Sequence, residues 1–79
     1  MGSTAVSHYS EQLRAQRRVT DRRIFDAFPE NRVATLTELR ARVPEIPPFW
    51  IPRVIERLVR RGCVMRLGHE VYQAAWWTD

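Results

Sequence analysis

The chain has 79 residues, of which 44% are hydrophobic and 28% are charged, and its formal net charge is +4. Such a length bounds the chain to one small domain, and this composition argues against wholesale disorder. No apolar run approaches the roughly 20 residues that a membrane span needs. The single cysteine, Cys63, excludes an internal disulfide and suits a reducing compartment. We therefore expect a small cytoplasmic domain with no membrane partner.

The positive charge comes entirely from arginine, which accounts for all 13 basic residues. A GC-rich genome, whose codons favour arginine over lysine, is one explanation. The functional alternative is that guanidinium groups bind phosphate oxygens and guanine edges bidentately. The arginines form an N-terminal group (Arg14, Arg17, Arg18, Arg22, Arg23) and a second group (Arg53, Arg57, Arg60, Arg61, Arg66), with acidic residues scattered between. This excess of positive charge favours a polyanionic partner.

Residues 1–19 are predicted to form a basic N-terminal arm, either mobile or helical. Residues 1–9 are small and polar and are expected to be mobile. From Ser10 the composition favours a helix, but only Leu13 and Val19 are apolar residues of real size. A stripe this thin predicts a frayed basic helix.

The first packed helix is expected to begin at Thr20, which suits an N-cap, with Asp21 in the first turn. Ile24, Phe25 and Phe28 form its apolar face, and Pro29 ends it. The arm and this helix are alternatively one continuous helix, and the sequence leaves both arrangements open.

A short strand over Arg32–Thr35 and a second helix are predicted next. Thr37 can cap this helix with Glu38 in its first turn, and Leu39 and Val43 face inward. Pro44 stops the helix, because proline disfavours helical dihedral angles in the residue before it.

The third helix, Pro48–Arg61, has the clearest amphipathic pattern in the chain. We expect its regular part to begin near Phe49 or Trp50, so that Pro52 falls within the first turn. Its apolar residues recur at helical spacing: Ile51, Val54, Ile55, Leu58 and Val59. Gly62 suits the left-handed position that follows a helix.

Two strands follow, Val64–Leu67 and Glu70–Ala74. Gly68-His69 between them fits a type II′ turn, in which glycine takes the positive φ. Of the two tryptophans after this hairpin, we expect one to cover the core against the first helix. The other, of Trp76 and Trp77, is then exposed and available to a dimer interface.

This order of elements over residues 20–74 resembles the winged helix-turn-helix superfamily of bacterial repressors, which includes the MarR, LexA and penicillinase-repressor families. The residues that carry the resemblance are Leu39 and Val43 in the positioning helix, Arg53, Leu58 and Gly62 at the recognition-helix ending, and Tyr72 in the second wing strand. The resemblance implies a mainly α fold with a small β-hairpin (α+β), a three-helix winged helix-turn-helix spanning residues 20–79 after the basic arm. It identifies no single family.

The resemblance further implies that the helix 48–61 enters the major groove of duplex DNA and that the hairpin 64–74 is the wing. The expected DNA-binding residues are Trp50, Arg53, Glu56, Arg57, Arg60, Arg66, His69, Arg14, Arg17 and Arg18. Arg53 is the expected base-edge or phosphate contact, with Arg57 on phosphate. The competing interpretation, weighed for each arginine, is a solvated charge or, for Arg60, a cation that stabilises the helix C-terminus.

Phe49-Trp50 departs from the family pattern, because DNA readers usually carry Ser, Thr or Gln at this place. An aromatic ring there could contact a thymine methyl group, or it could anchor a partner protein. We expect one of the two rings, but not both, to pack beneath the preceding helix.

No catalytic, metal or cofactor site is predicted. His8 and His69 lie far apart in the sequence, Cys63 is alone, and no Gly-rich phosphate loop is present. The resemblance implies a non-enzymatic DNA-binding regulator, a transcriptional repressor or a phage- or plasmid-type control protein, which we expect to pair as a homodimer. The alternatives are a protein-interaction module that uses Phe49, Trp50 and the C-terminal tryptophans, and a DNA-binding module in replication, recombination or partition.

Overall fold

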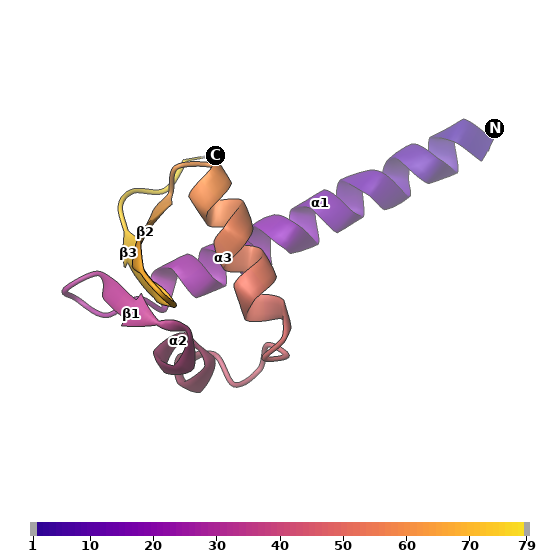
Figure 1. The fold of residues 1–79 in the computed structure, drawn as a ribbon. Helices are drawn as coiled ribbons and strands as arrows, with labels where there is room; N and C mark the ends of the chain where they lie inside the picture. Colours follow the sequence, from indigo (N-terminus) through magenta and orange to yellow (C-terminus); the bar gives the residue numbers. More distant parts are fainter. Residues whose placement is uncertain (1, 79) are drawn as a thin grey trace.

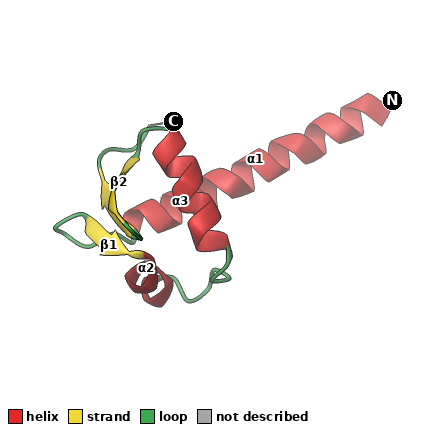
Figure 2. Ribbon diagram, in the orientation of Figure 1, coloured by secondary structure: helices red, strands yellow, loops and turns green. Residues whose placement is uncertain are grey.

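The computed structural model describes residues 2–78, with the side chains of residues 12–78. It contains three helices and one three-stranded antiparallel sheet, an α+β fold (Figures 1 and 2). The elements are α1 (Gly2–Asp26), β1 (Val33–Thr35), α2 (Leu36–Arg42), α3 (Trp50–Arg60), β2 (Val64–Gly68) and β3 (Val71–Ala74). The molecule measures 49 × 24 × 20 Å, because the N-terminal part of α1 extends well beyond the other elements (Figure 1).

Helix α1 is continuous, so the second of the two predicted arrangements is correct. The proposed N-cap, Thr20, lies inside the helix, and its hydroxyl donates to the Gln16 carbonyl at 3.0 Å. The helix ends at Asp26, three residues before Pro29, where the Ala27 N–H bonds the Ile24 carbonyl at 3.1 Å. The predicted boundary between residues 19 and 20 falls within α1, and the division into arm and domain stays a prediction.

Helix α2 is capped by Thr35 rather than by Thr37, which corrects the sequence prediction. Thr35 is the last residue of β1 and has extended backbone angles, and its hydroxyl accepts the Glu38 N–H at 3.2 Å. The same hydroxyl donates to the Glu38 carboxylate at 3.3 Å. A β-strand residue has the extended ψ that an N-cap needs, whereas Thr37 already lies in the first turn. The helix ends before Pro44 as predicted.

Helix α3 ends at Arg60, and Gly62 takes the left-handed position after it, as the sequence predicts. Gly62 has φ +80°, its N–H bonds the Val59 carbonyl, and the Cys63 N–H bonds the Leu58 carbonyl at 2.9 Å. These two bonds form a Schellman motif, which satisfies carbonyls that the helix end would otherwise leave free.

The sheet has the order β1-β3-β2, so that β3 is central and its Tyr72 pairs with both Ala34 and Arg66. The predicted type II′ turn at Gly68-His69 is wrong. An irregularity between Arg66 and Gly68 shifts the register, so Gly68 pairs with Val71 and the turn moves to His69-Glu70. Glu70, and not the glycine, has the positive φ, 56°.

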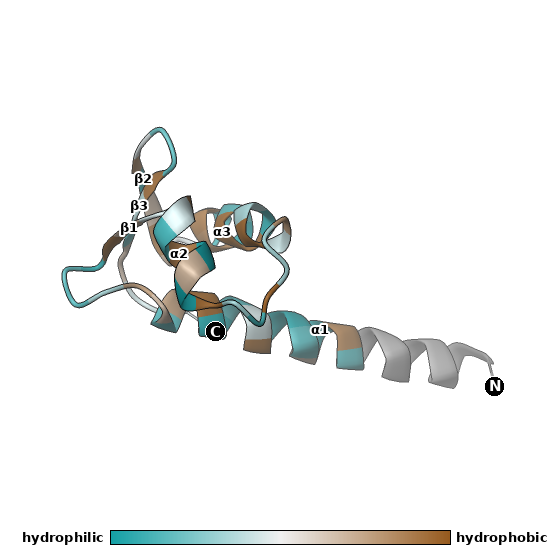
Figure 3. Cartoon of the chain, turned by 90° about the horizontal axis from the view of Figure 1, so that it is seen from below, coloured by the Kyte–Doolittle hydropathy of each residue, from teal (hydrophilic) through white to brown (hydrophobic). Residues whose placement is uncertain are grey.

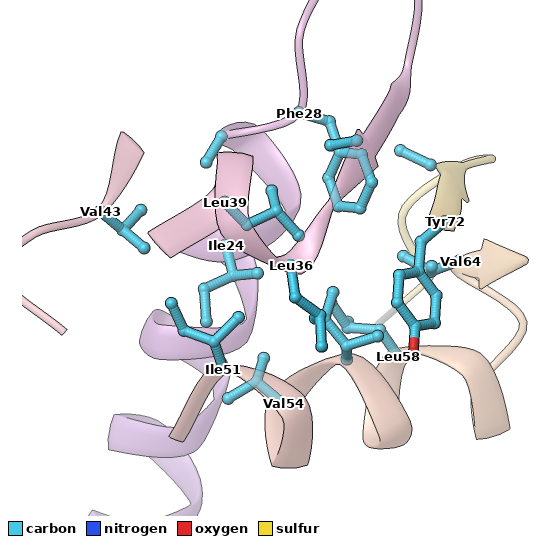
Figure 4. Packing of buried hydrophobic residues seen from close by; sticks show 14 of the residues in the cluster. Ile24, Phe28, Leu36, Leu39, Val43, Ile51, Val54, Leu58, Val64 and Tyr72 are labelled. Atoms are coloured by element: carbon cyan, nitrogen blue, oxygen red, sulfur yellow. The ribbon is translucent and has the colours of Figure 1, made fainter. Parts of the chain in front are cut away.

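The core lies where the C-terminal part of α1, helices α2 and α3 and one face of the sheet meet (Figures 3 and 4). Its largest fully buried side chains are Ile24, Leu39, Val43, Ile51, Val54, Ile55, Leu58, Cys63 and Val64. Cys63 is a free cysteine and is buried in this core. The core thus holds α3 with one face inward and leaves the opposite face to solvent.

Candidate nucleic-acid interface

The outer face of α3 is the surface that, according to the resemblance, is expected to contact DNA. Helical periodicity places its buried residues on one side (Ile51, Val54, Ile55 and Leu58) and the exposed residues Phe49, Trp50, Arg53, Glu56 and Arg60 around the other. The residues of this helix that were expected to bind DNA are therefore exposed, apart from Arg57, which is partly buried.

Arg57 turns toward α1, where it binds a buried carboxylate. Its Nη2 lies 2.7 Å from Oδ1 of Asp21, and Arg61 Nη1 lies 3.5 Å from the other oxygen. The Asp21 side chain is only 4% exposed, whereas those of Arg57 and Arg61 are 36% and 31% exposed. The prediction that Asp21 lies in the first turn of a helix is therefore wrong. Asp21 lies within α1 and joins it to α3. A phosphate at Arg57 would have to compete with this carboxylate.

Glu56 is also occupied by an arginine. Its carboxylate accepts a hydrogen bond from Nη2 of Arg66 at 2.9 Å, and both side chains are about half exposed. The Arg66 guanidinium lies 5.7 Å from the centre of the Tyr72 ring. This pair connects β2 to α3 and neutralises the one acidic side chain on the outer face of the helix.

Arg53 and Arg60, unlike Arg57 and Arg66, are not bound to a described carboxylate. Neither forms an ion pair or side-chain hydrogen bond among the side chains of residues 12–78. They are seven residues apart on the same helix, two turns and about 10 Å along its axis. Two unpaired guanidinium groups on one exposed face can bind two anionic groups at once.

The first turn of α3 offers no backbone donors to an anion. The Trp50 and Ile51 N–H groups bond the carbonyls of Pro47 and Pro48 at 2.9 and 3.2 Å, and Pro52 has no N–H. An anion at this end of the helix would therefore have to be bound by side chains.

The predicted arginines of the N-terminal arm lie along the exposed part of α1. Arg14, Arg17 and Arg18 are all exposed and form no ion pair with any side chain that the structure describes. Arg17 faces α3, since it lines a groove together with Arg53. His69 lies apart from these residues, exposed in the turn of the β2–β3 hairpin.

This groove between α1 and α3 was not predicted. It has a volume of about 330 Å³ and is lined by Leu13, Gln16, Arg17, Thr20, Trp50, Arg53, Val54 and Arg57. We call it the α1–α3 groove. A continuous α1 would have indicated it, because Leu13, Arg17, Thr20 and Ile24 then share one helical stripe. The same stripe argument would have placed Asp21 on the buried side, three residues before Ile24.

Both aromatic rings at the start of α3 are exposed, so the expectation that one of them packs beneath α2 is wrong. Phe49 is 64% and Trp50 45% exposed, and their ring centres lie 6.2 Å apart in an edge-to-face arrangement. The core between α2 and α3 is filled by Leu39, Val43 and Ile51, which leaves neither ring a place there.

The C-terminal tryptophans divide as predicted. Trp77 packs against Phe25 of α1 with ring centres 5.6 Å apart, and the guanidinium groups of Arg22 and Arg61 lie about 5 Å from its ring. Trp76 is 71% exposed. The C-terminal segment thus contacts both Arg22 and Arg61.

Among the residues that the structure describes, no group of three His, Cys, Asp or Glu side chains could hold a metal ion. Within the same residues, no helix is both long enough and apolar enough to cross a membrane. Comparison of the chain with protein-family models, curated proteins and solved structures gives no match.

Proposed function

We propose that the chain is a small winged-helix protein that binds duplex DNA, with α3 in the major groove and the β2–β3 hairpin as the wing. The observation that carries the proposal is the pair Arg53 and Arg60, unpaired on the exposed face of α3. Neighbouring arginines of the same helix and hairpin are bound to Asp21 and Glu56 instead. Arg53 and Arg60 therefore differ from these neighbouring arginines, because no described carboxylate binds them.

The roles follow from where each charge lies. Arg53, nearer the helix N-terminus, contacts a base edge or an adjacent phosphate, and Arg60 contacts phosphate. Glu56 can accept from a cytosine amino group, and Arg66 holds its carboxylate in place. Arg57 supports the positive field while bound to Asp21. Arg14, Arg17 and Arg18 contact the backbone beyond α3, and His69 at the hairpin tip contacts backbone or minor groove.

The biological role that we propose is regulatory, most simply that of a cytoplasmic transcriptional repressor. A single domain of this size covers little DNA, so tight specific binding calls for a homodimer on a two-fold site. No enzymatic step is included in the proposal.

The test is duplex binding by fluorescence anisotropy over a series of salt concentrations. Binding should weaken steeply with salt, and Arg53→Ala should cost about 1–3 kcal/mol if it reads a base, or lower the salt slope by about one if it contacts phosphate. Arg40→Ala is the matched control, because Arg40 is exposed on α2 and forms no ion pair among the described side chains. Absence of duplex binding at low salt would refute the proposal.

The exposure of both Phe49 and Trp50 favours a second candidate function, docking of a partner protein. Substitution of either ring by alanine would then abolish a protein complex and leave duplex affinity unchanged. A DNA-binding role would instead couple the ring substitutions to DNA affinity.

A further inference from the structure

We infer that the α1–α3 groove binds unpaired nucleotides of a DNA strand that continues from the duplex on α3. The inference rests on the proposed function for the position of the duplex, and it adds a substrate class, DNA with a single-stranded overhang or junction. Three features of the groove carry it: its charge, its aromatic rim and its place beside the outer face of α3.

The charge of the groove suits a phosphate backbone. Arg17 projects from α1 and Arg53 from α3, and none of the described residues that line the groove is acidic. Arg57 also lines the groove but is bound to Asp21, so Arg17 and Arg53 are the lining arginines that no described carboxylate holds. Basic grooves of this kind follow the backbone of single strands without reading its sequence.

The rim of the groove supplies a surface for bases. Trp50 lines the groove, and Phe49 beside it holds the indole ring through an edge-to-face contact with an interplanar angle of 86°. Leu13 and Val54 add an apolar floor. Exposed aromatic rings within a basic surface are the usual platform on which unpaired bases stack.

The geometry favours an unpaired base over a duplex base for this platform. Bases within a duplex present only their edges to a helix in the major groove, and their faces are covered by neighbouring base pairs. An aromatic face can stack only on a base that has left the stack. The groove volume of about 330 Å³ lies at the lower end of small-ligand pockets, about 300–1,000 Å³, which suits one nucleotide rather than a larger ligand.

The experiment compares two kinds of labelled DNA probe with the full chain by fluorescence anisotropy at one salt concentration. One probe is a blunt duplex, and the other is the same duplex with five thymidines extending from one strand, tested at the 5′ and the 3′ end. We expect one polarity of overhang to bind about tenfold more tightly than the blunt duplex, because each stacked base contributes a factor of this order. Trp50→Ala should lower this ratio to about one, whereas Trp76→Ala, which removes an exposed ring outside the groove, should not change it.

A matched pair of substitutions on α1 separates the charge inside the groove from the general charge of the helix. Arg17→Ala and Arg18→Ala remove the same charge from adjacent residues, but only Arg17 lines the groove. Both should weaken blunt-duplex binding similarly, and only Arg17→Ala should lower the preference for the overhang. Far-UV circular dichroism checks that each variant is folded.

The outcomes distinguish the two proposals. Equal affinity for blunt and overhanging probes would overturn the inference and leave duplex binding standing, with the rings free to contact thymine methyl groups. Binding of an overhanging probe without any binding of the blunt duplex would overturn the duplex proposal and support the groove. Binding of neither probe would overturn both.

Discussion

Asp21 makes the sharpest prediction about stability, because it is a buried carboxylate held by two arginines. Asp21→Asn keeps the size of the side chain and one acceptor oxygen but removes the charge that Arg57 and Arg61 face at 2.7 and 3.5 Å. Removal of one partner of a fully buried ion pair costs about 3–5 kcal/mol. Both guanidinium groups are about one-third exposed, so water recovers part of this loss.

We therefore expect Asp21→Asn to lower the free energy of unfolding by about 2 kcal/mol, less than the cost for a fully buried pair. For a domain of this size that loss corresponds to a fall in Tm of roughly 8–16 °C. Urea unfolding followed by far-UV circular dichroism measures the free energy, and an unchanged m-value shows that the unfolded state is comparable.

Asp26→Asn is the matched control for this substitution. Asp26 lies on the same helix and pairs with Arg22, but both side chains are about half exposed, so we expect a loss of no more than about 0.5 kcal/mol. If the two variants lose the same free energy within about 0.5 kcal/mol, the Asp21 cluster does not stabilise the contact between α1 and α3.

Three further substitutions test the local structure by urea unfolding. Thr35→Ala should cost about 1 kcal/mol, because it removes the cap of α2, while Thr37→Ala should change stability by less than about 0.5 kcal/mol; equal losses would contradict the capping assignment. Gly62→Ala should cost about 1–2 kcal/mol, because φ is +80° although the space around a Cβ is open, and no loss would argue against the left-handed conformation. Ile55→Ala should cost about 2–5 kcal/mol, since Ile55 is fully buried in the core; a loss below 1 kcal/mol would mean that the site is not close-packed.

The elements of the fold were largely predictable because their signals are local. The spacing of Ile51, Val54, Ile55 and Leu58 requires an amphipathic helix, and Pro44 and Gly62 end helices through their own backbone chemistry. The predicted helix start was wrong where two nearby residues of the same type could both act as the cap. Thr35 and Thr37 both suit a cap, and only the pairing of β1 with β3 gives Thr35 its extended backbone.

The candidate site was predictable only in part, because local sequence patterns do not show which carboxylate each arginine binds. All the expected arginines lie on the surface, yet only the three-dimensional structure separates Arg53 and Arg60 from Arg57 and Arg66. The pairs Arg57–Asp21 and Arg66–Glu56 join residues 36 and 10 positions apart in the sequence. These separations in sequence are longer than the repeat of a helix or a strand, so periodicity does not predict the two pairs.

Local sequence patterns were enough to predict an amphipathic α3 that ends before Gly62, a hairpin after it, and a basic composition without a catalytic or metal-binding motif. These follow from side-chain periodicity, backbone preferences and composition, which act within a few residues. The tertiary structure alone decided that α1 is one helix crossing α3, that its buried Asp21 engages Arg57, and that Phe49 and Trp50 both face solvent beside a basic groove. Those outcomes depend on how much of the core other residues fill and on which charges meet when distant elements pack.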